Sequence, residues 1–139
     1  MREIVAQPSA APGRAVSGGL LYGLRVLVTA QLVGLLVAAS FAGQAVRGGA
    51  VPAETHVMVG TVVHLIALLQ SAAALLVWRP GRGAGWPAAA SLGLLLGGLG
   101  QHFGPEPPSL HVAGGLVLSG LTAALLIWAW SPRAAVRRS

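Results

Sequence analysis

The sequence predicts an all-α fold, and specifically an integral membrane, four-helix, up-and-down bundle. Of its 139 residues, 55% are hydrophobic and only 9% are charged, whereas a soluble domain carries about 25% charged residues. A chain with so little charge cannot cover a globule of this size with polar surface. The apolar residues also come in four blocks, each close to the roughly 20 residues that a membrane-spanning helix requires.

The four blocks are the expected spans, and they run over about 20–46, 55–78, 86–103 and 110–130. The segments between them read RGGAVPAE, RPGRGAG and GPEPPS, and Gly–Pro clusters of this kind stop helices and form turns. The bundle then occupies residues 19–131. Residues 1–18 have the Ala, Pro, Ser and Gly bias of a disordered tail, and residues 132–139 form a basic tail.

The arginines predict the orientation of the spans. All nine basic residues are arginine, and eight of them lie in the two tails, at the start of the first span, or between the second and third spans. Only Arg47 lies on the other side, together with Glu54 and Glu106. The positive-inside rule therefore predicts that both termini are cytoplasmic. The net charge of +6 does not indicate a nucleic-acid surface, because the arginines are spread thinly at helix ends. We expect the lipid bilayer to be the partner of these residues, and nucleic acid not to be one.

A short motif occurs twice. The second span begins THVMVG and the fourth begins with LHVAGG, so both contain His-Val-x-x-Gly, with His56 and Gly60 in one copy and His111 and Gly115 in the other. The first and third spans are also similar, since GLLVAASFAGQ in one corresponds to GLLLGGLGQ in the other. This pattern indicates a duplicated helical hairpin.

The repeat places two histidines at matching depth near the outer surface. The second and fourth helices of an up-and-down bundle are diagonal neighbours, so His56 and His111 can face each other across the interior, where bundles build their ligand sites. Two neutral imidazoles on opposite sides of a planar iron macrocycle are a bis-histidine haem site. Gly60 and Gly115 lie on the same helix faces, about 6 Å deeper, and leave room for the macrocycle edge. Small residues also suit close packing of membrane helices.

The second span begins with an acid-x-His sequence, Glu54-Thr55-His56, and the fourth begins with Leu110-His111. This pairing resembles the helical half-bundles of haem A synthase, a set of small actinobacterial membrane proteins and, more loosely, other four-helix b-type cytochromes. The resemblance covers about residues 20–130 and implies a haem b in a bacterial plasma membrane, with His56 and His111 as axial ligands. Haem A synthase motifs have an arginine directly after the first histidine, where this chain has Val57. Arg47 is therefore the outer basic residue that remains to pair with a haem propionate. A single half-bundle also argues against haem-modifying activity.

The other two histidines have more than one interpretation. His64 lies about 12 Å deeper than His56 on the same helix, where no other histidine is expected. It is either a buried neutral side chain bonded to another helix or the ligand in place of His56. His102, at the outer end of the third span, is either an interfacial residue or a hydrogen-bond partner of a propionate. Gln31 and Gln70 are expected to form interhelical hydrogen bonds.

The sequence favours a membrane b-type cytochrome-like protein for electron transfer or redox sensing, with a redox partner or a larger membrane complex around it. Two alternatives stay open: a single copper or zinc ion on His56, His102 and His111, or a cofactor-free accessory or assembly subunit. Homo-oligomers are compatible with either. The chain has no cysteine, no carboxylate pair, no phosphate loop and no nucleophile beside a base, so no enzyme activity is indicated.

Overall fold

The computed structural model describes residues 15–48, 52–104 and 107–138, and this part of the chain is helical and without strands. It contains four α-helices and a short 3₁₀-helix: α1 (Gly18–Val46), α2 (Ala53–Trp78), α3 (Trp86–Phe103), α4 (Pro108–Trp130) and η1 (Pro132–Ala135). The predicted all-α fold with four helices is confirmed, with bounds within a few residues of those expected. Glu106 and most of the predicted N-terminal tail lie outside the described residues.

Proline and glycine set the helix boundaries. Pro87 and Pro108 lie in the first turns of α3 and α4, where the missing backbone N–H costs no intrahelical hydrogen bond. Gly48 follows α1 with a φ of 69°, a left-handed conformation that glycine adopts without steric cost. Gly81 lies so close to the end of α2 that an added Cβ would stand 2.5 Å from the carbonyl oxygen of Val77. The connection between α2 and α3 is therefore a tight turn.

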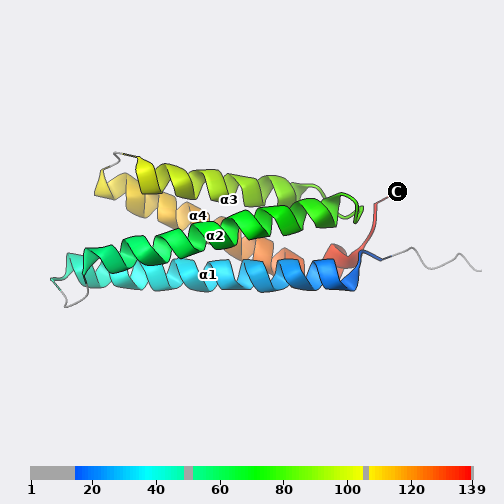
Figure 1. Ribbon diagram of the computed structural model, residues 1–139, viewed down its shortest axis with the longest axis horizontal. Helices are drawn as coiled ribbons and strands as arrows, with labels where there is room; N and C mark the ends of the chain where they lie inside the picture. Colours follow the sequence, from blue (N-terminus) through cyan, green and yellow to red (C-terminus); the bar gives the residue numbers. More distant parts are fainter. Residues whose placement is uncertain (1–14, 49–51, 105–106, 139) are drawn as a thin grey trace, which may run out of the picture.

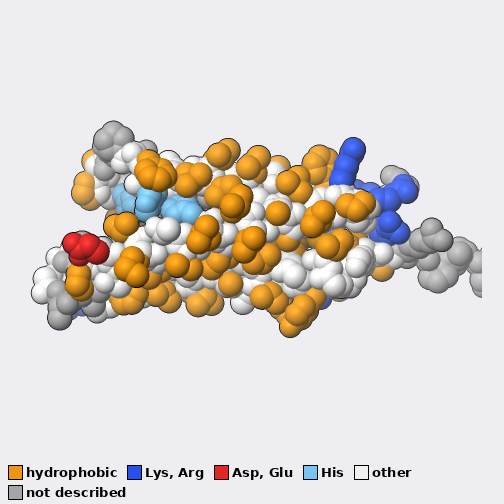
Figure 2. All heavy atoms as spheres, in the orientation of Figure 1, with side chains coloured by type: hydrophobic (Ala, Val, Ile, Leu, Met, Phe, Trp, Pro, Cys, Tyr) orange, Lys and Arg blue, Asp and Glu red, His pale blue; other side chains and the backbone are white. Residues whose placement is uncertain are grey.

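The helices alternate in direction along the bundle (Figure 1). α1 packs against α2 and α4, and α3 packs against the same two helices, so α2 and α4 are diagonal. The start of α1, the α2–α3 connection and the end of α4 share one end of the bundle. We call it the basic end, because Arg79, Arg82 and the C-terminal arginines lie there. The histidines gather toward the opposite end, the histidine end (Figure 2).

The apolar core extends from the basic end toward the middle of the bundle. Its most deeply buried members come from all four helices and include Leu24, Val28, Val77 and Leu125. Toward the histidine end, the α1/α2 hairpin and the α3/α4 hairpin diverge (Figure 1). The two hairpins are therefore held together mainly at the basic end, and the histidines lie where they separate.

Three of the helices, α1, α2 and α4, are long and apolar enough to cross a membrane. The sequence predicts a fourth span, but α3 is not among the helices that are long and apolar enough to cross a membrane. It has 18 residues, or about 27 Å at 1.5 Å per residue, and its last turn carries Gln101 and His102. Many large apolar side chains on the outer faces of the helices are exposed, among them Leu36, Leu65 and Leu116.

Candidate functional site

Two cavities lie at the histidine end. The central cavity, about 190 Å³ in volume, is lined from all four helices by Gln31, Leu35, Ala38, His56, Val57, Gly60, Val63, His64, Ala67, Leu94, Gly98, Gln101, His102, His111 and Leu118. The lateral cavity, about 390 Å³, lies between α1 and α4 and has Gly115 and Ser119 in its wall. Five residues line both cavities: Leu35, Ala38, His56, Gln101 and His111. The His56–His111 pair therefore lies where the two cavities meet.

His56 is held in one tautomer by the neighbouring helix. Its Nδ1 lies 2.9 Å from the carbonyl oxygen of Ala38 on α1, and a carbonyl oxygen can only accept a hydrogen bond. Nδ1 therefore carries the proton, and Nε2 keeps a free lone pair. This is the arrangement that metal-binding histidines commonly show, with one ring nitrogen bonded to a backbone carbonyl.

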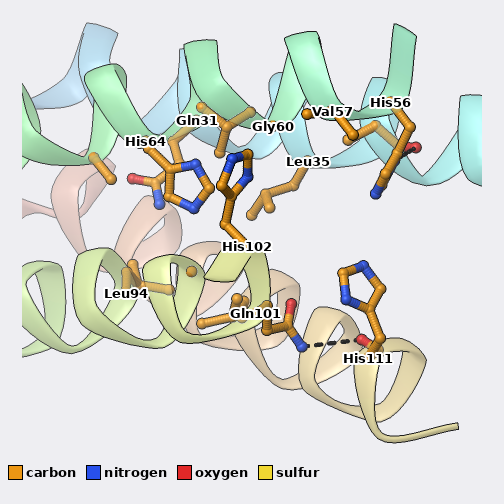
Figure 3. Close-up of a pocket in the computed structure, with 15 residues that line it drawn as sticks. Gln31, Leu35, His56, Val57, Gly60, His64, Leu94, Gln101, His102 and His111 are labelled. Carbon is orange, nitrogen blue, oxygen red and sulfur yellow. Dashed lines mark hydrogen bonds between the residues drawn. The ribbon is translucent and has the colours of Figure 1, made fainter. Parts of the chain in front are cut away.

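His111 faces His56 from the first turn of α4. The two rings point toward one another (Figure 3), with 5.7 Å between their centroids and 69° between their planes. Two imidazoles on one metal ion have metal–nitrogen distances of about 2.0–2.1 Å, which puts their ring centroids roughly 6 Å apart. The rings of His56 and His111 thus have nearly the separation that a shared metal ion requires.

Gln101 ties the end of α3 to the start of α4. Its Nε2 donates a hydrogen bond of 3.0 Å to the backbone carbonyl of His111. The side chain passes directly over Gly114, where an added Cβ would collide with Nε2 of Gln101. Gln44, which ends the corresponding repeat in α1, is exposed and bonds within its own helix. The two copies of the repeat therefore differ in how they support the histidine that follows.

A second histidine pair lies deeper in the central cavity. The rings of His64 and His102 are 5.1 Å apart between centroids, with 77° between their planes. His64 lies against Gly98, where an added Cβ would stand 2.9 Å from Nε2, and His102 lies 3.9 Å from the position of a Cβ on Gly60. The expectation that no histidine meets His64 at its depth is wrong.

The polarity of the helices explains this pairing. Side chains on a helix lean toward its N-terminus. α3 runs toward the histidine end, so the side chain of His102 leans back toward the basic end. α2 runs away from the histidine end, so the side chain of His64 leans toward the histidine end. Residue counting alone places their Cα atoms at different depths, but the two rings converge.

Gln31 adds a buried polar group to the inner wall of the central cavity. Its side chain is 2% exposed, and its Oε1 has no hydrogen-bond partner. Figure 3 shows it beside His64. Farther toward the basic end, Nε2 of Gln70 donates a hydrogen bond of 3.0 Å to Oγ of Ser91, which is the interhelical bond expected for Gln70. For Gln31, the described residues offer Oε1 no such partner.

The remaining predicted residues are distributed as follows. Gly60 lines the central cavity and Gly115 the lateral one. Arg47 is exposed in the turn after α1 and is not among the residues that line either cavity. Among the described residues, no three His, Asp or Glu side chains come together around one metal position. His56, His102 and His111, the histidines expected in the copper or zinc alternative, are therefore not gathered around one position, because His102 turns toward His64.

Comparisons of the chain with protein-family models, with curated proteins and with solved structures find no match. The site is therefore interpreted from its own geometry. Sequence reasoning missed the carbonyl of Ala38 and the role of Gly98, which leave no signature in a chain this rich in alanine and glycine. A signal for Gln101 did exist, since it ends the repeated Gly-Gln block.

Proposed function

We propose that this protein is an integral membrane, b-type cytochrome-like protein that holds one haem b between His56 and His111. The observation that carries the proposal is the facing pair of imidazoles on diagonal helices, 5.7 Å apart, at the junction of two cavities. When bound, the haem supplies a reversible one-electron couple. The resemblance of the paired acid-x-His and Leu-His helix starts to haem A synthase half-bundles supports the same assignment.

The residues present fit a flat, bulky group. His56 offers a free Nε2 because its Nδ1 is bonded to Ala38. The two cavities extend away from the line between the rings, and each has a repeat glycine in its wall, Gly60 or Gly115. An added Cβ would meet no atom within 4 Å at Gly115 and only His102, at 3.9 Å, at Gly60. Neither glycine therefore places a side chain in the space beside the pair.

The histidine end also suits acidic substituents of such a group. α2 and α4 both begin there, and helix N-termini carry partial positive charge. Arg47 lies at the same end and is exposed. We propose that these groups favour propionates directed toward that surface. His102 faces His64, so we assign it to the inner wall of the cavity. If His56 and His111 both held the haem, the role expected of it would be electron transfer or redox sensing.

The bundle spans the bacterial plasma membrane in this proposal, with both termini and the α2–α3 connection in the cytoplasm. Three helices are long and apolar enough to cross. The fourth, α3, has to cross as well, since α2 ends at the basic end and α4 begins at the histidine end. The concentration of arginines at the basic end (Figure 2) supports this orientation through the positive-inside rule.

One observation favours a second candidate, a cofactor-free accessory or assembly subunit. The central cavity of about 190 Å³ is smaller than the 300–1,000 Å³ of typical ligand pockets, and both histidine pairs already lie edge to face. In this second reading the histidines are packing groups. The haem proposal instead requires the α1/α2 and α3/α4 hairpins to separate further at the histidine end.

The absorption spectrum of the purified protein distinguishes the two. We expect protein from haem-replete cells to show a Soret band and, after reduction, the sharp visible bands of low-spin, six-coordinate haem b. Protein that purifies colourless and does not take up added haemin contradicts the haem proposal and leaves the accessory subunit.

A further inference from the structure

A third cavity lies at the basic end, far from the histidines. It has a volume of about 330 Å³ and is lined by Trp78, Arg79, Pro80, Arg82, Gly83 and Arg138. These residues come from the end of α2, the α2–α3 connection and the C-terminal segment. Three arginines from two separate parts of the chain, the α2–α3 connection and the C-terminal segment, thus share the wall of one cavity.

Backbone hydrogen bonds bring these parts together. The N–H of Arg138 donates to the carbonyl of Arg82 over 2.8 Å, and the N–H of Gly83 donates to that of Val77, also over 2.8 Å. Arg82 has a φ of 59°, an uncommon conformation for a residue other than glycine. The C-terminal segment is therefore fixed across the α2–α3 connection.

The positive charges in the cavity wall favour binding of an anion. Glu54 is the only acidic side chain among the described residues, and it lies in the first turn of α2, at the opposite end of the bundle. Like charges gathered in one place repel each other, and a bound anion removes that repulsion. Among anions, phosphate matches the guanidinium group best, because it accepts paired hydrogen bonds from the planar N–H fork.

Trp78 adds an apolar wall that a free phosphate would not need. The residue is 40% exposed, and the guanidinium of Arg79 lies over its ring, 5.3 Å from the ring centroid. Tryptophan favours the interface between lipid headgroups and acyl chains. A ligand with a phosphate beside the arginines and a hydrocarbon chain along Trp78 satisfies both parts of the cavity.

We propose that this cavity binds the phosphate group of an anionic phospholipid from the cytoplasmic leaflet. The assignment of the leaflet rests on the membrane orientation proposed above. The binding itself is independent of haem, because the two sites lie at opposite ends of the bundle and share no residue. The chemistry is of a known kind, since basic pockets at the cytoplasmic ends of membrane helices hold lipid headgroups.

The test is native mass spectrometry of the detergent-purified chain, titrated with phosphatidylglycerol or phosphatidylcholine. We expect one tightly retained phosphatidylglycerol per chain and much weaker retention of phosphatidylcholine. The double variant Arg79→Gln/Arg138→Gln removes two cavity arginines. At about fivefold per arginine, it should bind phosphatidylglycerol roughly 25-fold more weakly. The matched control Arg47→Gln/Arg133→Gln removes two charges outside the cavity wall and should change binding less than twofold.

Three results would overturn the proposal. The first is equal phosphatidylglycerol binding by the wild type and the Arg79→Gln/Arg138→Gln variant, when both have the same helical circular dichroism. The second is an equal loss of binding in the control variant. The third is release of the lipid by millimolar inorganic phosphate, which would identify a site for free phosphate. The titration measures lipid binding whether or not the protein contains haem. A negative result for lipid binding is therefore distinguishable from failure of the haem proposal.

Discussion

The imidazole rings of His56 and His111 face each other across the bundle, 5.7 Å apart between centroids, although α2 and α4 are diagonal and do not pack on each other. α1 and α3 hold them in place: the carbonyl of Ala38 accepts a hydrogen bond from His56, and Gln101 donates one to the backbone of His111. All four helices thus contribute to the position of one pair of rings. This relationship leads to the first prediction.

If His56 and His111 hold a haem as proposed, replacing either with alanine should abolish the low-spin spectrum of the reduced protein, because each substitution removes one of the two proposed ligands. His64→Ala and His102→Ala should leave that spectrum largely intact, since their rings pair with each other deeper in the cavity. Absorption spectra of the four purified variants, with haem content measured as the pyridine complex, make the comparison. If His64→Ala loses its haem and His56→Ala does not, the protein still binds haem in its native form, but the ligand on α2 is His64 and not His56.

Leucine in place of Gly60 or Gly115 should expel the cofactor while the protein still inserts, because the new side chain fills the space beside the histidine pair. Gly120→Leu is the matched control: an added Cβ there meets nothing within 4 Å, the residue is exposed, and it lines neither cavity. The measurement is haem per chain in membrane-extracted protein. A fully loaded Gly60→Leu protein would show that this glycine does not make room for haem.

Gly34→Ala should destabilise the bundle, because an added Cβ would stand 2.7 Å from Cγ2 of Val63, a buried residue of α2. Overpacking of this kind costs about 1–3 kcal/mol. Gly23→Ala, also in α1, meets nothing within 4 Å and should leave stability unchanged or raise it by up to about 1 kcal/mol. Reversible unfolding in detergent–denaturant mixtures gives both values, and equal stabilities for the two variants would contradict the α1–α2 packing described above.

Ser91→Ala should cost about 1 kcal/mol of unfolding free energy. Both Ser91 and Gln70 are fully buried, and the substitution leaves Nε2 of Gln70 without its acceptor. Ser40→Ala is the control, since Ser40 is exposed and bonds only to a carbonyl of its own helix. The double variant Gln70→Leu/Ser91→Ala should recover most of the loss, because no polar group is then left unpaired. Additive losses in the double variant would contradict a specific bond between the two side chains.

Cysteine labelling in whole cells tests the orientation, and it is simple in a chain without native cysteine. A membrane-impermeant thiol reagent should label Glu54→Cys, at the histidine end, in intact cells. It should label Arg82→Cys, at the basic end, only after the membrane is made permeable. The opposite pattern would reverse the topology and place the histidine pair at the cytoplasmic face.

The sequence by itself was sufficient to predict the helices. Apolar blocks of membrane-spanning length, interrupted at Pro52, Gly81 and Pro107, leave few places where a helix can begin or end, because these choices depend on local composition. Short connections then favour antiparallel neighbours, which makes the second and fourth helices diagonal. The facing positions of His56 and His111 follow from that topology. The composition of α3 is the exception, since its glycines and polar last turn leave it less apolar than a typical span.

Only the tertiary structure decided how the other polar groups meet. Counting residues at 1.5 Å each locates Cα atoms along a helix but not the direction in which side chains lean between helices of opposite polarity. That direction brings His102 to His64 and leaves Oε1 of Gln31 unpaired beside them. Likewise, Nδ1 of His56 bonds to the carbonyl of Ala38 because α1 passes within reach. A backbone carbonyl is present at every residue, so the sequence cannot mark the one that a neighbouring helix brings close.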